Sequence, residues 1–216
     1  MTHDPLLNRI CDELMEAGAH TILLYGSRAD GSANALSDYD VAGFAPVAHV
    51  IRDTRVVDGC FLDVFLYPGD ALDRPTPELL KLRGSRILVQ RDGGTATRFL
   101  AELEAVYQQG PERLAEDEIR ARDVWARKMA LRAQRGDAEG DYRRVWLLTA
   151  LLEDYFVTRQ MWFEGPKKAL QWLLTHDTVL YHAFQAALKP DTSVTAIDTL
   201  VDLVTRREAP SRRSAV

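Results

Sequence analysis

The sequence Leu-Leu-Tyr-Gly-Ser at residues 23–27, followed by Ser-Asp-Tyr-Asp at residues 37–40, determines the expected fold of the N-terminal part of this chain. The first segment is typical of an apolar strand that ends in a Gly-Ser turn. The second segment contains Asp38 and Asp40, and residues i and i+2 of a strand point to the same face of a sheet. We therefore expect the two carboxylates to lie side by side.

Two neighbouring carboxylates repel each other unless a cation neutralises them, and Tyr39 between them supplies no charge. A hard divalent ion is the simplest partner, since Mg²⁺ usually binds one or two carboxylates together with substrate phosphates. The Gly26-Ser27 turn fits a phosphate, because glycine allows a close backbone approach and serine and backbone N–H groups at the start of a short helix can bind the oxygens. The pattern predicts a site for Mg²⁺ and a nucleoside triphosphate.

These residues also resemble a family signature. The Gly-Ser…Asp-x-Asp motif is similar to that of the DNA polymerase β-like nucleotidyltransferase superfamily, which includes minimal nucleotidyltransferases and aminoglycoside nucleotidyltransferases. The resemblance implies a third carboxylate on a neighbouring strand, and Asp63 stands at the centre of the apolar segment 61–67. Relatives often carry a basic residue at the position of Asp30. The motif residues are Gly26, Ser27, Arg28, Asp38 and Asp40.

The resemblance implies a role for each motif residue in transferring a nucleoside monophosphate to an acceptor hydroxyl. Asp38 and Asp40 would bind two metal ions, and Asp63 would bind the ion nearer the acceptor and help to deprotonate it. The β- and γ-phosphates would be held by the turn residues Gly26, Ser27 and Arg28. Ordinary turn chemistry is the alternative interpretation, because Gly-Ser and Ser-Asp also occur in loops that bind nothing. An aspartate inside so apolar a strand nevertheless favours a functional site.

Composition limits the classes of function. The 216 residues are 46% hydrophobic and 27% charged, as in an ordinary globular protein. A net charge of −5 argues against a broad basic surface and so against nucleic acid as a partner. Cys11 and Cys60 lack metal-ligand spacing, and the N-terminus lacks a signal pattern. We therefore expect a cytoplasmic protein that does not enter the membrane. A homodimer is compatible with this sequence.

The order of elements predicts a fold in two parts. An α+β sheet domain with α/β character is expected over residues 1–93, and a helical bundle that binds the acceptor over 95–208. Residues 209–216 are expected to be a disordered tail. This layout is similar to that of kanamycin-type nucleotidyltransferases. In the first domain we expect helices over 5–17 and 77–83, and strands over 21–25, 38–44, 51–57, 60–67 and 87–90. In the second region helices are expected over 97–109, 111–135, 142–163, 166–175, 178–188 and 194–207.

Charged residues inside the C-terminal helices are weaker candidates. Glu153 and Asp154 interrupt an apolar helix, where a carboxylate could act as a base, although a solvated helix face is the commoner case. Asp123 and Arg127 have the spacing of an i,i+4 ion pair.

Three functions fit the sequence. The leading one is metal-dependent transfer of a nucleoside monophosphate, AMP from ATP, to a hydroxylated small molecule such as an aminoglycoside. The second is adenylylation of a protein, as minimal nucleotidyltransferase antitoxins perform, and the third is a nucleotide-binding module without catalysis. The third is disfavoured because costly charges such as those of Asp38, Asp40 and Asp63 would be lost first.

Overall fold

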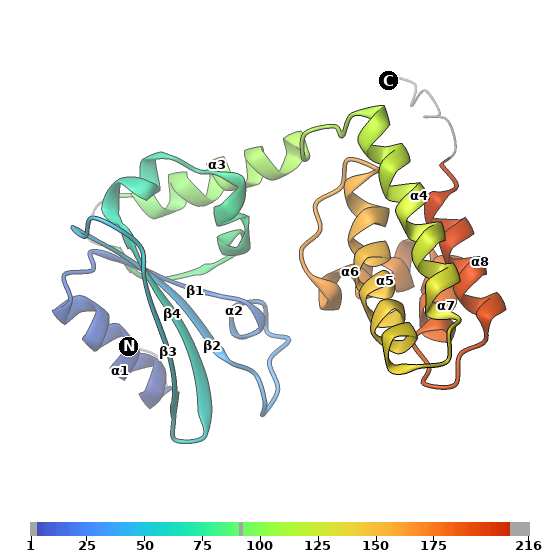
Figure 1. Cartoon of the computed structure of the whole chain (residues 1–216). Coiled ribbons are helices and arrows are strands. Elements are labelled where there is room, and N and C mark those ends of the chain that lie inside the picture. The colour runs from blue at the N-terminus through green and yellow to red at the C-terminus, as the bar shows by residue number, and fades with distance from the viewer. Residues whose placement is uncertain (1–3, 91–92, 208–216) are drawn as a thin grey trace. The chain divides into compact units, whose positions relative to one another are not determined.

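The computed structural model describes residues 4–90 and 93–207 and divides into two compact units, Met1–Gln109 and Gly110–Val216 (Figure 1). The predicted tail at 209–216 lies outside the described residues. The expected class is confirmed, because a mixed sheet with helices precedes a region made of helices alone. Within the described residues, no helix has the length and apolar character needed to cross a membrane.

The first unit is a five-stranded sheet with the strand order β3-β4-β2-β1-β5. Strands β2 and β4 are parallel, whereas the other neighbouring strands are antiparallel. The strands are β1 (Thr21–Tyr25), β2 (Tyr39–Ala45), β3 (Ile51–Val57), β4 (Cys60–Pro68) and β5 (Arg86–Gln90). The helices are α1 (Pro5–Glu16), α2 (Ser27–Asp30) and α3 (Thr95–Gln109), with 3₁₀ turns η1 (Gly69–Asp73) and η2 (Pro77–Leu82).

Helix α1 covers one face of this sheet. Its buried residues Leu7, Ile10 and Leu14 share a core with Val41 and Val64, which alternate along their strands with residues on the other face of the sheet. The helix lies close to β2 because Gly43 leaves room for it: a Cβ at this position would be 3.2 Å from Leu14 Cδ2. Residues 40 and 63 therefore face away from α1.

The β3–β4 hairpin turns at Asp58 and Gly59, between the two expected strands. Asp58 and Gly59 both have positive φ, 53° and 78°, which suits the tight two-residue turn that Asp-Gly favours. The turn fixes the hairpin pairing, with Val57 opposite Cys60 and Thr54 opposite Asp63.

The boundary between the units differs from the predicted end at residue 93. Helix α3 belongs to the first unit, because its buried residues Ala96, Phe99 and Leu103 complete the core on that side. The Phe99 ring packs edge-on against Phe44 of β2 at 5.7 Å between centroids. A hydrophobic face, rather than a change in composition, thus decides where the first unit ends.

The second unit consists of α4 (Glu116–Ala133), α5 (Ala138–Val157), α6 (Pro166–His176), α7 (Thr178–Ala187) and α8 (Val194–Thr205). Three predicted boundaries differ from the structure by four residues or more. Helix α4 begins at Glu116 instead of residue 111. The three acidic residues of its first turn complement the positive end of the helix dipole. Helix α5 begins four residues early, because the Asp137 side chain caps the Gly140 N–H, and it ends at Val157, before Gln160 adopts a φ of 56°.

Candidate active site

The pairing of β2 with β4 brings two predicted site residues together. Asp40 and Asp63 are direct partners in the parallel register, so their side chains project from the same face of the sheet. Asp38 is exposed and lies just before β2. The arrangement brings Asp63 of β4 next to Asp40 of β2, with Asp38 just before the start of β2.

Asp40 is partly buried and lies near two other carboxylates. Burial raises the pKa of its carboxyl above the ordinary value of 3.8, and the charges of Asp38 and Asp63 raise this pKa further. Lys81 and Arg28 oppose these effects from a distance. Among the described residues, none forms a hydrogen bond or ion pair with the Asp40 carboxylate.

The Gly26-Ser27 turn lies directly against Asp40. Gly26 has φ 67° and ψ −159°, a backbone conformation that only glycine adopts readily. A Cβ at this position would stand 2.2 Å from Asp40 Oδ2. The glycine is thus required both by the turn and by the carboxylate beside it. Ser27 begins the short helix α2, which is capped at its C-terminal end by Gly31.

Gly26→Ala is expected to destabilise the first unit by about 2–3 kcal/mol, since a side chain would impose both a strained backbone and a clash with Asp40. Chemical denaturation followed by circular dichroism measures this loss. Gly31→Ala is the matched control, because Gly31 also has positive φ, 81°, but a Cβ there would meet nothing within 4 Å. Equal losses for the two variants would contradict the close packing of Gly26 on Asp40.

Arg28 donates hydrogen bonds to backbone carbonyl oxygens of the segment before β2. Its Nε donates to the Asp38 carbonyl oxygen at 3.0 Å and its Nη2 to the Ser37 carbonyl oxygen at 2.7 Å. The guanidinium also lies 3.8 Å from the centre of the Tyr39 ring. These contacts give Arg28 a positioning role for the segment that carries Asp38, while contact with a phosphate stays a prediction.

Two basic residues that sequence reasoning missed lie beside the aspartates. Arg52 forms a bidentate ion pair with Asp63, with Nε and Nη2 at 2.7 and 3.0 Å from the two carboxylate oxygens. Lys81 Nζ lies 3.4 Å from the centre of the Phe65 ring, and its pKa is lowered by burial, against the influence of Asp63. In the β3–β4 hairpin Thr54 lies opposite Asp63, and Arg52 stands two positions from Thr54. The Arg52–Asp63 ion pair could therefore be predicted only by knowing the hairpin register.

The site fits a divalent cation only in part. In residues 4–90 and 93–207, no group of three His, Cys, Asp or Glu side chains is arranged to hold a metal ion. Arg52 occupies both oxygens of Asp63, so the three aspartates do not form a common cage. Asp40, unpaired and next to Asp38, retains the chemistry that Mg²⁺ needs, since one or two carboxylates suffice when phosphates supply other ligands.

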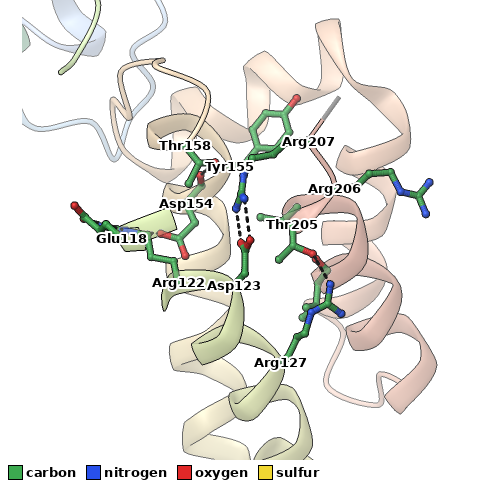
Figure 2. Close-up of polar contacts among 12 residues, drawn as sticks. Glu118, Arg122, Asp123, Arg127, Asp154, Tyr155, Thr158, Thr205, Arg206 and Arg207 are labelled. Atoms are coloured by element: carbon green, nitrogen blue, oxygen red, sulfur yellow. Dashed lines mark hydrogen bonds and ion pairs between the residues drawn. The ribbon is translucent and has the colours of Figure 1, made fainter. Parts of the chain in front are cut away.

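The candidate residues of the helical unit have structural partners (Figure 2). Asp154 is buried, not on a solvated face, and pairs with Arg122 at 2.6 Å, whereas Glu153 is exposed. The predicted Asp123–Arg127 pair is wrong, because Asp123 binds Arg207 and Arg127 binds Asp202, both on or after α8. These ion pairs join α4 to α5, to α8 and to a residue after α8. They result from tertiary packing and could not be predicted from i,i+4 spacing.

Comparisons with known proteins give little further guidance. The sequence matches no protein-family model, and no curated protein matches it. A solved structure described as a nucleotidyltransferase-like protein from Exiguobacterium sibiricum 255-15 is similar with a TM-score of 0.43 and 10% identity, over 92% of this chain and 71% of that chain. A likeness of this size carries no argument about mechanism.

Proposed function

We propose that this protein is a cytoplasmic nucleotidyltransferase that transfers a nucleoside monophosphate from a nucleoside triphosphate, ATP by preference, to the hydroxyl of a small molecule. The new phosphoester bond to this hydroxyl forms as the bond between the α- and β-phosphates breaks, and pyrophosphate leaves. One observation carries the proposal: Asp40 and Asp63 are partners across β2 and β4, and the Gly26 turn packs against Asp40. Carboxylates beside a Gly-Ser turn are suited to a metal-bound triphosphate. Neither Asp40 nor Asp63 belongs to the core that α1 covers, since both lie on the face of the sheet away from α1.

Each residue has a chemical role in this proposal. Asp40, with Asp38, would hold Mg²⁺, which when bound neutralises charge on the transferring phosphoryl group. The backbone at Gly26 and the Ser27 hydroxyl would hold the phosphates. Asp63 would accept the proton of the acceptor hydroxyl after Arg52 moves from its carboxylate to an anionic group of the substrate. Lys81 would add positive charge next to the phosphates.

Binding of Mg²⁺ together with a non-hydrolysable ATP analogue tests the proposal without requiring the acceptor. At a hundredfold excess over Kd, we expect the thermal midpoint of the wild type to rise by about 5–10 °C. The rise should shrink as the pH falls from neutral towards 4, because a carboxyl with a raised pKa takes up a proton in this range and then no longer attracts the cation.

Differential scanning fluorimetry with and without Mg²⁺ measures this shift. Asp40→Asn should lose the Mg²⁺-dependent part, whereas Asp198→Asn, on the exposed side of α8, should keep it. A wild-type protein whose midpoint does not respond to Mg²⁺ and the analogue would exclude the proposed site.

A further inference from the structure

Helix α4 carries an exposed stripe that is separate from its buried side. The stripe residues follow alternating spacings of four and three, the pattern of a helix seam that packs against another helix. Val124 and Leu131 are 63% and 69% exposed although both are large and apolar. The buried side of α4 is formed by Ala126, Met129 and Ala130. The stripe consists of Asp117, Ala121, Val124, Lys128 and Leu131, all of them exposed.

The charges of α4 divide between these two sides. Arg122, Asp123 and Arg127 form ion pairs with α5, with α8 or with the residues that follow α8 (Figure 2). In the described part of the chain, Asp117 and Lys128 of the stripe form no ion pair, although the Asp117 carboxylate accepts the Glu118 N–H. A shallow groove runs between them, lined by Asp117, Arg120, Ala121, Val124, Trp125 and Lys128.

The groove is complementary to itself. If two copies of α4 pack antiparallel about a two-fold axis between residues 122 and 123, Asp117 of each copy lies opposite Lys128 of the other. The same axis places Ala121 opposite Val124. A parallel arrangement would instead place like charges together, so charge selects the antiparallel one.

Helix α5 extends the apolar surface. The Trp125 ring of α4 contacts the Trp146 ring of α5 at 5.3 Å between centroids, and Tyr142 lies beside Trp146 at 6.4 Å. Tyr142, Val145 and Trp146 are 69%, 60% and 48% exposed. Aromatic side chains with large exposed areas are typical of protein interfaces.

We propose that α4 forms a two-fold symmetric interface with α4 of a second copy of this chain, with Val124 and Trp125 at its centre and Asp117–Lys128 pairs at both ends. We assign a second copy as the occupant because the charged and apolar positions of the stripe match those of the same helix when it is reversed. This interface is independent of the proposed function, since its residues belong to the helical unit alone.

A charge exchange tests the interface. Sedimentation velocity of the full chain at about 50 µM should show a dimer for the wild type. Asp117→Lys and Lys128→Asp should each raise the dimer Kd by about tenfold or more, because symmetry makes every substitution create two like-charge contacts. The double variant Asp117→Lys/Lys128→Asp restores opposite charges at both ends and should return the Kd to within about threefold of the wild type.

Matched controls show whether the effects are specific to the α4 stripe. Asp198→Lys makes the same charge change on α8 and should leave the Kd unchanged. Val124→Glu should abolish the dimer, whereas Val179→Glu, at an equally exposed valine of α7, should not. A monomeric wild type, or a double variant no tighter than the single variants, would overturn the proposal, as would single variants that dimerise normally and thereby point to another partner surface.

Discussion

Asp40→Asn is expected to lower the rate of nucleotidyl transfer by about 10³-fold or more while leaving the fold intact. The amide keeps the shape of the carboxyl and its contact with Gly26, but it no longer carries the charge that would hold a cation. Burial raises the pKa of Asp40 in the wild type and repulsion from Asp38 and Asp63 raises it further, and the substitution removes this repulsion. The thermal midpoint in the absence of ligand should therefore be unchanged or higher.

Transfer from α-labelled ATP to a panel of hydroxylated acceptors measures the rate, and the melt is followed by circular dichroism. Asp58→Asn is the matched control, because Asp58 is exposed in the β3–β4 turn, where asparagine tolerates a positive φ. A variant at position 40 that retains wild-type transfer would eliminate Asp40 as the metal-binding residue. A simultaneous loss of fold and transfer would assign it to stability instead.

Arg122→Met is expected to cost about 3 kcal/mol of stability in the helical unit at neutral pH. The substitution leaves the Asp154 carboxylate, only 10% exposed, without its ion-pair partner. Burial already raises the pKa of Asp154 and Arg122 opposes that rise, so the variant should raise it further. Because the folded state then binds the proton more tightly than the unfolded state does, the loss should diminish as the pH falls from neutral towards 4.

Urea denaturation at several pH values measures this effect. Replacing both partners, Arg122→Met with Asp154→Leu, should recover most of the lost stability, since no buried charge remains. Arg127→Met is the control for removal of an arginine, because its pair with Asp202 is exposed on both sides and should cost less than about 1 kcal/mol. Equal losses for Arg122→Met and Arg127→Met would show that burial of Asp154 contributes nothing.

Local patterns predicted most of the elements, because alternation, caps and turn residues act within a few positions. The Asp-Gly turn, the two faces of β4 and the Gly-Ser turn before α2 could all be read in this way. The ends of the helices were harder to predict from the sequence. The start of α4 depends on where acidic residues meet the helix dipole, and the end of α5 depends on the positive φ of Gln160.

The candidate site was predictable to the extent that it depends on alternation. Asp40 and Asp63 face the same side because each follows the two-residue period of its own strand and the strands are neighbours. The partners of these residues were not predictable. Arg52 binds Asp63 diagonally across the β3–β4 hairpin. Lys81 belongs to the 3₁₀ turn η2, so its position beside the aspartates depends on how this turn packs against the sheet.

Short-range patterns in this chain specify which residues face the core, where the strands turn and that acidic residues follow the Gly-Ser turn, because these properties follow from near neighbours. Folding in three dimensions was needed to establish that Arg52 neutralises Asp63, that Asp123 and Arg127 bind partners after α7, and that α3 joins the sheet. Such contacts join residues that are distant along the chain, and their pairing depends on strand register and helix packing, which no local pattern records.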